Sequence, residues 1–302
     1  MLSLHTNSAA LSAQNSIGRT QSSLSTSQTR LSTGFRVNSA MDDAAGLQIA
    51  TRLKAQTSGM AMAMRNTQNS ISMLQTAEGA FDEVTTMLTR MKDLATQAAD
   101  ASSTAKDQAA LQSEYDALGT ELNNVMKNTT FGGATLLDGG SIASAMTFQI
   151  GASKSETMSM NLTTSMTTLV ATLGTVTARY AAPTTTTAST EISDGSDGTA
   201  VGATNAAGQT AANATIDTIS TAIDQVGSVR SSLGATANRL DHVYNNLSNI
   251  STNTKAASGR IMDTDFATES SNMTSSQMLL QAGTAMLKQS NSTSSLVMSL
   301  LQ

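Results

Sequence analysis

Apolar residues recur in steps of three and four along two long stretches of the chain, with polar residues between them. The pattern holds through residues 74–98 and again through residues 216–247. In the first stretch the apolar positions are Leu74, Ala77, Phe81, Val84, Leu88, Met91, Ala95 and Ala98. In the second they are Ile216, Ile219, Ile223, Val226, Leu233, Ala237, Leu240, Tyr244 and Leu247, with Arg230 interrupting. Sustained heptads of this kind predict long helices that pack against one another as in a coiled coil.

Both ends of the chain carry a narrower apolar stripe on a helix that is otherwise rich in serine and threonine. The N-terminal stripe consists of Leu4, Leu11, Ile17, Leu24 and Leu31, and it stops near Gly34. The C-terminal stripe consists of Met278, Leu279, Met286, Leu287, Leu296, Val297, Leu300 and Leu301. We expect Ser258 and Gly259 to break the second long helix and Asp265 to cap the last one.

A turn-forming stretch separates the N-terminal helix from the next one. It begins at Gly34, which favours a helix C-terminus. We expect Ser39 to cap the second helix, with Asp42 three residues later completing a variant of the capping box. Asp43 is also favourable near the positive end of that helix. On these residues alone, the stretch is a connector between two helices.

The middle of the chain has a different pattern of apolar and polar residues. A polar break at residues 101–107 precedes a further helix. Residues 131–162 then contain two runs in which apolar and polar residues alternate, which predicts a β-hairpin with one apolar face. The apolar members are Met146, Phe148 and Ile150, then Met158, Met160 and Leu162. Residues 181–211 hold TTTTAST and the only proline of the chain, and they predict an exposed loop.

These elements predict a mainly α-helical protein. The helical pattern is nearly symmetric about the hairpin, so we expect the chain to double back on itself. The result would be an elongated rod of long antiparallel coiled-coil-like helices with a small β-hairpin. The N- and C-terminal helices would then be paired at one end. With only 3% aromatic residues and 18 methionines, the helices must pack through small and flexible apolar side chains.

Composition and motifs exclude several classes of function. A net charge of −5 without basic clusters argues against nucleic-acid binding. No apolar run is long enough for a membrane span, and the N-terminus lacks the features of an ordinary secretory signal peptide. The chain has no cysteine, two isolated histidines and none of the common catalytic motifs. We therefore expect no enzyme activity, no metal and no cofactor.

The two apolar stripes at the chain ends imply assembly. Ordering the backbone costs roughly 1–2 kcal/mol per residue, while a fully buried leucine or isoleucine returns about 1.5–3 kcal/mol. Each terminal helix has too few large apolar residues to offset that cost within one chain. We expect both ends to be largely disordered in the free subunit and to fold against neighbouring copies.

Several segments resemble those of the bacterial flagellins, the subunits of the flagellar filament. They include RLSTGFRVNSAMDDAAGLQIATRL, QTAEGAFDEV, LTRMKDLATQAA, TTFGGATLLDG, LGATANRLDHVYNNLSN and GRIMDTDFATESSNM. The resemblance covers roughly residues 1–165 and 213–302. It implies an inner terminal domain of residues 1–42 and 258–302, and an outer helical domain of residues 43–170 and 212–257. Residues 171–211 would be a short variable surface-exposed segment, in place of the large outer domains of many flagellins.

The resemblance also implies roles for individual residues. The connector would be a spoke at which subunits touch, with Arg36, Asn38, Asp42 and Asp43 as polar contacts between neighbours. The segment LTRMKDLATQAA is similar to the patch bound by the Toll-like flagellin receptor of animals. Arg90 and Leu94 match its motif, and Glu114 matches its partner position; Thr89, Lys92 and Asp93 depart from it.

Family resemblance further implies partners and a location. The chain would form a homopolymer, leave the cell through the flagellar type III export apparatus and lie in the extracellular filament. Other partners would be an export chaperone on the C-terminal segment and the flagellar cap and hook-junction proteins.

Two alternatives stay open from the sequence. A hook–filament junction protein shares the terminal helices, although that family tends to have a proline after the paired aspartates, whereas this chain has MDDAAG. A soluble exported coiled-coil effector would tolerate trimming of about 40 residues from either end.

Overall fold

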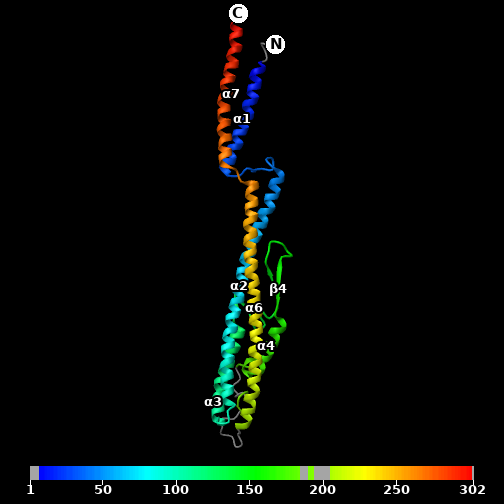
Figure 1. Ribbon diagram of the computed structural model, residues 1–302, viewed down its shortest axis with the longest axis vertical. Helices are drawn as coiled ribbons and strands as arrows, with labels where there is room; N and C mark the ends of the chain where they lie inside the picture. Colours follow the sequence, from blue (N-terminus) through cyan, green and yellow to red (C-terminus); the bar gives the residue numbers. More distant parts are fainter. Residues whose placement is uncertain (1–6, 184–189, 194–204, 301–302) are drawn as a thin grey trace. The chain divides into compact units, whose positions relative to one another are not determined.

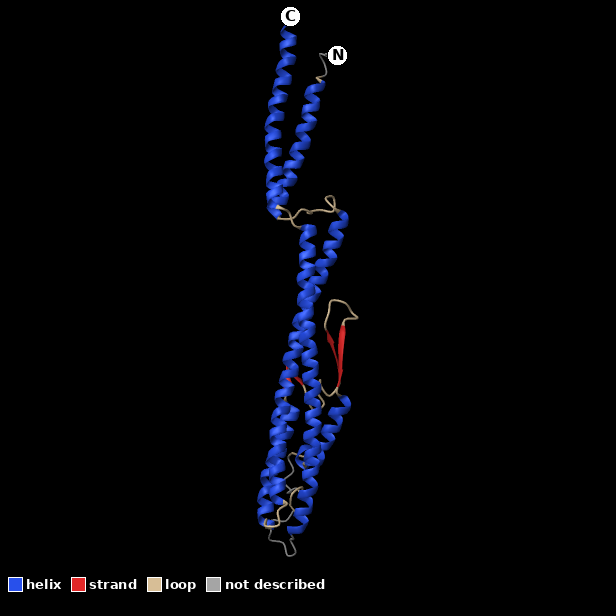
Figure 2. Cartoon of the chain, viewed as in Figure 1, coloured by secondary structure: helices blue, strands red, loops and turns tan. Residues whose placement is uncertain are grey.

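The structure, a computed structural model, describes residues 7–183, 190–193 and 205–300 (Figures 1 and 2). The helices are α1 Ser8–Thr33, α2 Ala44–Ala98, α3 Ala105–Asn128, α4 Thr163–Val176, α5 Ala178–Ala181, α6 Asn205–Met262 and α7 Phe266–Leu300. The strands are β1 Thr130–Phe131, β2 Ala134–Thr135, β3 Ala145–Gln149 and β4 Thr157–Asn161. The prediction of a mainly helical protein with a small β-hairpin is confirmed.

The chain divides into two compact units. The terminal unit combines Met1–Ser58 with Ile250–Gln302, and the central unit is Gly59–Asn249. Both division points fall inside α2 and α6, rather than at the expected boundaries after residue 42 and before residue 258. The terminal unit is larger because the first turns of α2 and the last turns of α6 bury side chains there, including Ala50 and Ser251.

The core of the central unit follows the predicted heptads. All eight apolar positions predicted between residues 74 and 98 are buried. On α6, one predicted heptad position is buried throughout, at Ile219, Val226, Leu233, Leu240 and Leu247. The other is half-buried, at Ile216, Ile223, Ala237 and Tyr244. Arg230, which interrupts the α6 pattern, reaches Asp82 on α2 with an N–O distance of 3.0 Å. The two seams therefore meet, as the sequence predicts.

The sequence predicted the start of α3 correctly and the end of α6 incorrectly. The expected polar break ends with a capping box, in which Thr104 and Asp107 satisfy each other's backbone N–H groups. The expected break at Ser258 and Gly259 is wrong, because α6 continues through both to Met262. A helical glycine costs only about 1 kcal/mol relative to alanine, so one of them does not end a helix of this length.

The predicted hairpin is present, although its strands end just before Ile150 and Leu162, which the sequence included in the two runs. Strands β3 and β4 are antiparallel, with Met146 opposite Met160 and Phe148 opposite Met158, so one face is apolar. A second, smaller hairpin of β1 and β2 precedes it. Its turn consists of Gly132 and Gly133, whose φ angles of 60° and 86° lie in the left-handed region that favours glycine. The sequence predicted only turns at that point.

The expected surface-exposed segment, residues 171–211, needs correction. Its first part belongs to the core, where Leu173 and Val176 of α4 are fully buried, and Ile192 is fully buried further on. The side chain of Gln112 on α3 holds this region, since its Oε1 accepts from the N–H of Ile192 at 2.8 Å. The TTTTAST stretch lies almost entirely outside the described residues.

Polar contacts beneath α5 explain how a region so rich in polar residues packs. Arg179 of α5 donates to the Asp116 carboxylate of α3 at 2.6 Å, and both side chains are largely buried. The Tyr115 hydroxyl donates to the carbonyl of Val176 at 2.7 Å. Burial raises the pKa of Tyr115, and the nearby carboxylates of Glu191 and Asp116 raise it further, so the phenol stays a neutral donor.

Candidate assembly surface

The connector between α1 and α2 is fixed to the end of α6. Gly34 caps the C-terminus of α1: it has a φ of 76°, and its N–H donates to the carbonyl of Arg30. The N–H of Arg36 then donates to the carbonyl of Met262 at 2.6 Å, and its guanidinium donates to the carbonyl of Ile261 at 2.8 Å. The N–H of Thr264, in the second connector between α6 and α7 (residues 263–265), donates to the carbonyl of Gly34 at 3.0 Å, so the two connectors of the terminal unit are tied together within one chain.

Three of the predicted spoke residues, Asn38, Asp42 and Asp43, lie in one hydrogen-bonded turn, residues 38–43, whereas Arg36 bonds to the end of α6. The Asp42 carboxylate accepts the N–H groups of Asn38 and Ser39 at 3.0 and 2.9 Å. Asp43 caps α2 by accepting the N–H of Gly46 at 2.8 Å. The expectation that Ser39 caps α2 is wrong, because its hydroxyl bonds to Asp42 and the helix begins at residue 44.

Hydrogen bonds stabilise the charged form of two carboxylates near the helix ends, those of Asp42 and Asp265. Backbone donors of Ser39 and Asn38 lower the pKa of Asp42, and the hydroxyl and N–H of Thr268 lower that of Asp265, which caps α7 as predicted. A carboxylate with a folded-state pKa below its ordinary value of 3.8 stabilises the fold above that pH. This contribution is lost as the pH falls through the lowered folded-state pKa.

Helices α1 and α7 run antiparallel and side by side (Figure 1), so the predicted pairing of the terminal helices is present. Asn7 lies against Ser290 at one end, and Arg30 lies 3.8 Å from Glu269 at the other. Gly283 allows a close approach, because a Cβ there would lie 2.9 Å from Ile17. The structure thus gives each terminal helix the intrachain partner that the sequence predicts.

The α1–α7 interface uses only part of the predicted apolar stripes. Ile17, Leu24, Leu31 and Leu287 are half-buried in it. Leu11, Met278, Leu279 and Met286 are instead exposed, by 51%, 59%, 62% and 66%. Leu4 and Leu301, and the side chains of Leu296, Val297 and Leu300, lie outside the described part of the chain. One helix pair therefore covers one face of each stripe and leaves the other open.

Exposed apolar side chains concentrate in the terminal unit. Within the described residues, the exposed large apolar side chains are Leu11, Phe35, Met41, Ile49, Met62, Ile250, Phe266, Met278, Leu279 and Met286. All of them except Met62 belong to the terminal unit. Exposed apolar surface of this kind marks interaction sites in folded proteins.

The predicted receptor patch is only partly on the surface. Arg90 on α2 and Glu114 on α3 form an exposed ion pair, with the Nε and Nη2 atoms donating to one carboxylate oxygen at 2.9 and 2.6 Å. Leu94 is 1% exposed and belongs to the helical core, so its placement in a surface patch is wrong.

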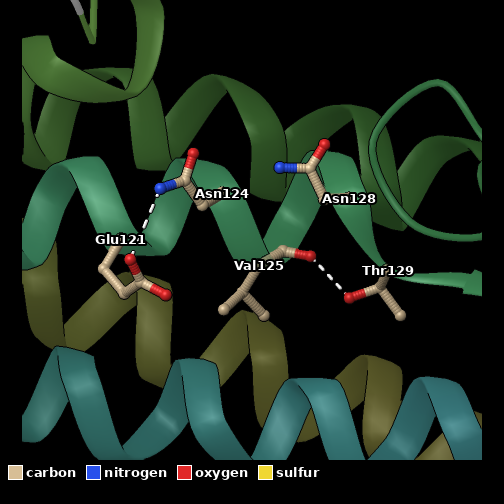
Figure 3. Close-up of a pocket in the computed structure, with 5 residues that line it drawn as sticks. All are labelled: Glu121, Asn124, Val125, Asn128 and Thr129. Atoms are coloured by element: carbon tan, nitrogen blue, oxygen red, sulfur yellow. Dashed lines mark hydrogen bonds between the residues drawn. The ribbon is translucent and has the colours of Figure 1, made fainter.

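The described hollows are shallow and polar. One of them lies along the last turns of α3 and is lined by Glu121, Asn124, Val125, Asn128 and Thr129 (Figure 3). The hydrogen bonds among these residues run along the same helix, from Asn124 to Glu121 and from Thr129 to the carbonyl of Val125. The hollow is thus a helix surface that ends in a C-cap, without the converging groups of a ligand site.

In the described ranges, no helix combines the length and apolar character that crossing a bilayer requires. The same ranges hold no group of three or more acidic or histidine side chains arranged to bind a metal ion.

Comparison with known proteins identifies the family. The N-terminal helical region of bacterial flagellin matches residues 4–141, and its C-terminal helical region matches residues 216–301. The chain belongs to the bacterial flagellin family. Flagellin A of Vibrio anguillarum is 36% identical over the full length of both chains, and a flagellin of Halalkalibacterium halodurans is 36% identical over 90% of each.

One solved structure supports the fold. A structure from Vibrio parahaemolyticus assigned to a flagellar hook-associated protein covers 74% of this flagellin and 100% of its own chain, with 16% identity and a TM-score of 0.51. The Bacillus cereus flagellin structure covers 61% of this chain and 88% of its own, with 26% identity and a TM-score of 0.44. Full-length similarity to flagellins makes the chain a structural subunit of the flagellar filament for motility, and nothing in the comparisons favours the junction-protein alternative.

Sequence reasoning missed three residues of this flagellin's surface. Phe35 and Met41 lie in the connector between α1 and α2, and Phe266 is the first residue of α7. None of them continues a heptad, so periodicity could not select them. These residues could have been found by a different signal, which is a large apolar residue within a short and mostly polar connecting segment.

Proposed function

We propose that this flagellin polymerises through its terminal unit, with neighbouring copies covering the apolar surface that one chain leaves exposed. The observation that carries the proposal is the concentration of exposed large apolar side chains in that unit. A flagellin forms a homopolymer, so the natural cover for this surface is another copy of the same chain.

The geometry of α7 supports this assignment. Leu280 and Leu287 are seven residues apart and face α1, where both are half-buried. Leu279 and Met286 are also seven residues apart, and both are mostly exposed on a neighbouring face of the same helix. A helix with a second apolar face requires a second partner to cover it.

Seeded growth tests the proposal. Purified subunits mixed with short filament fragments should elongate into long filaments that are visible by electron microscopy. A chain that only caps the seeds would behave as a junction protein and contradict the proposal. A variant lacking the first 40 residues should not elongate; normal elongation by that variant would show that the terminal unit is not needed.

Export and further partners follow from the same exposed surface. The apolar face at Met278, Leu279 and Met286 would need cover before assembly, which suits an export chaperone on the C-terminal segment. The subunit would pass through the flagellar type III apparatus, meet the cap and hook-junction proteins, and lie in the extracellular filament.

The Arg90–Glu114 pair is the proposed receptor contact. Its polar groups are exposed and held together, which suits binding to an animal Toll-like flagellin receptor. We expect Arg90→Ala to raise the monomer concentration for half-maximal receptor signalling about tenfold, the loss of one charged hydrogen-bonded contact.

A receptor reporter assay measures this effect, and Arg52→Ala is the matched control because Arg52 is also exposed and lies in the terminal unit. Equal signalling by the Arg90→Ala monomer and the unmodified monomer would contradict the receptor role.

A further inference from the structure

The faces of α1 and α7 that meet each other repeat every seven residues. On α7, large apolar residues fill one position of the repeat, and polar or small residues fill the other. The apolar set is Met273, Leu280 and Leu287, and the other set is Glu269, Ser276, Gly283 and Ser290. On α1, the same spacing separates Ile17, Leu24 and Leu31. A slip of seven residues, about 10 Å along the axis, brings apolar positions together again, so the apolar pattern does not fix the register by itself.

An ion pair marks the observed register near one end of the two helices. The Nη1 atom of Arg30 lies 3.8 Å from Oε2 of Glu269, which is only 8% exposed. The hollow that holds the pair is lined mostly by serines from both helices. Glu269 is the only acidic residue in the sequence of α7, and the only other basic residue of α1 is Arg19, more than one heptad away. A seven-residue slip would therefore leave Glu269 buried without a cation, which is costly.

A close contact marks the same register two heptads further along α7. A Cβ at Gly283 would lie 2.9 Å from the Cγ1 atom of Ile17. Carbon atoms pack best at about 3.5–4.0 Å, so a larger residue opposite Ile17 would have to push it aside. Slips of seven residues in the two directions would place Ser276 or Ser290 there, each with a Cβ and a hydroxyl. Ile17 therefore fits the observed register better than either slipped one.

We propose that the Arg30–Glu269 pair and the Ile17–Gly283 contact, which we call the register contacts, fix the alignment of α1 along α7. A polar pair inside a helix interface adds little stability, and the selection of one register is its best-attested use. The alignment also determines where the exposed Leu279 lies relative to α1. The inference concerns a single chain, so it stands independently of the proposed polymerisation.

The connectors offer a competing explanation of the register. The hydrogen bond from the N–H of Thr264 to the carbonyl of Gly34 holds one end of the helix pair. If this tie alone set the register, substitutions farther along the two helices would not alter it. The test must therefore compare registers directly, and a measurement of stability alone would not separate the two explanations.

Engineered cysteine pairs report the register, because the chain has no cysteine of its own. Counted from the glycine contact, Thr20→Cys should face Leu280→Cys in the observed register. It should face Leu287→Cys or Met273→Cys in the two slipped registers. All four positions are half-buried on the inner faces of the helices. A slip moves each partner by about 10 Å, and cysteines whose Cα atoms are more than about 7 Å apart cannot form a disulfide, so each pair reports one register.

The measurement is the equilibrium fraction of each intrachain disulfide in dilute subunits held in a glutathione redox buffer. Mass spectrometry identifies the disulfide, and crosslinks between copies are removed by size. We expect the observed-register pair to exceed each slipped pair by at least about tenfold. Because the ratio is taken at equilibrium, it does not require α1 and α7 to be fully ordered in the free subunit.

Two substitutions remove one register contact each. Gly283→Ser places a serine at 283 like those at 276 and 290, so the space opposite Ile17 no longer differs between registers. Glu269→Gln removes the buried charge. Each should lower the ratio of observed to slipped disulfide about threefold or more. The exchange of charges in Arg30→Glu with Glu269→Arg should restore the ratio, which a purely structural effect of either residue would not do.

Matched controls lie on the same helix pair. Gly18→Ser makes the same substitution at a glycine of α1 where an added Cβ meets nothing within 4 Å. Arg19→Gln removes an exposed charge from α1. Both should leave the disulfide ratio within about twofold of the unmodified chain.

The outcomes decide between the register contacts and the connectors. Equal amounts of observed and slipped disulfides in the unmodified background would show that nothing fixes the register. An unchanged ratio in both Gly283→Ser and Glu269→Gln would show that the connectors set it, and either result would overturn the proposal. A failure of the unmodified chain to elongate would overturn the proposed polymerisation and leave this inference untouched.

Discussion

Replacing Met278, Leu279 and Met286 together by glutamine is expected to abolish filament growth at ordinary subunit concentrations. The three side chains are 59%, 62% and 66% exposed in the subunit. Covering the exposed part of each would contribute about 1–2 kcal/mol, from the 1.5–3 kcal/mol for full burial. Together they contribute about 3–6 kcal/mol, which corresponds to a rise of about 100-fold to 10⁴-fold in critical concentration.

The measurement is the subunit concentration that remains in solution at equilibrium with seeds. The triple variant alters exposed positions only, so its circular dichroism and melting curve should match the unmodified subunit. A triple substitution that left the critical concentration within threefold of normal would show that neighbours do not cover this face of α7.

Arg179→Met is expected to destabilise the central unit by about 3 kcal/mol. Arg179 donates to Asp116 at 2.6 Å, and the two side chains are only 10% and 15% exposed. Removing one partner leaves the other charge buried without its counterion, which is costly even where the pair itself adds little. Urea unfolding followed by circular dichroism measures the change.

Two controls make this expectation specific. Arg230→Met removes a more exposed pair with Asp82, at 31% and 67%, and should cost less than about 1 kcal/mol. The double variant Arg179→Met with Asp116→Leu should recover part of the lost stability, because no unpaired charge remains. Equal destabilisation by Arg179→Met and Arg230→Met would contradict the role of the buried pair.

The sequence predicted the periodic parts of the fold well. The seam from Leu74 to Ala98 is buried as expected, and its partner on α6 is buried or half-buried, because a heptad repeat fixes which face of a helix meets its neighbour. The β-hairpin followed for the same reason, since alternation places Phe148 and Met158 on one face.

The sequence could not predict features that depend on distant residues. The packing of Ile192 requires a hydrogen bond from its N–H to the side chain of Gln112 on α3, eighty residues earlier, and no local sequence pattern predicts that bond. Continuation of α6 through Gly259 depends on the whole helix and not on one residue. Asp43 caps α2 in place of the predicted Ser39, because the Asp42 carboxylate accepts the N–H of Ser39 in a turn that precedes the helix.

The candidate site was predicted in part. Periodicity selected the terminal stripes. The same periodicity does not distinguish residues that face the intrachain partner from residues that face a neighbouring copy. Ile17 packs against α7, whereas Leu11 on the same predicted stripe is exposed. The six-residue step between them rotates Leu11 away from the face that meets α7.

Amide hydrogen exchange, compared between verified monomers and filaments, tests most directly whether neighbouring copies complete the terminal unit. In monomers, α1 and α7 should exchange far faster than the buried seam of α2, because their shared interface is mostly half-buried. In filaments, both helices should become as protected as that seam. Strong protection of α1 and α7 already in the monomer, unchanged on assembly, would show that one chain suffices to hold its own ends.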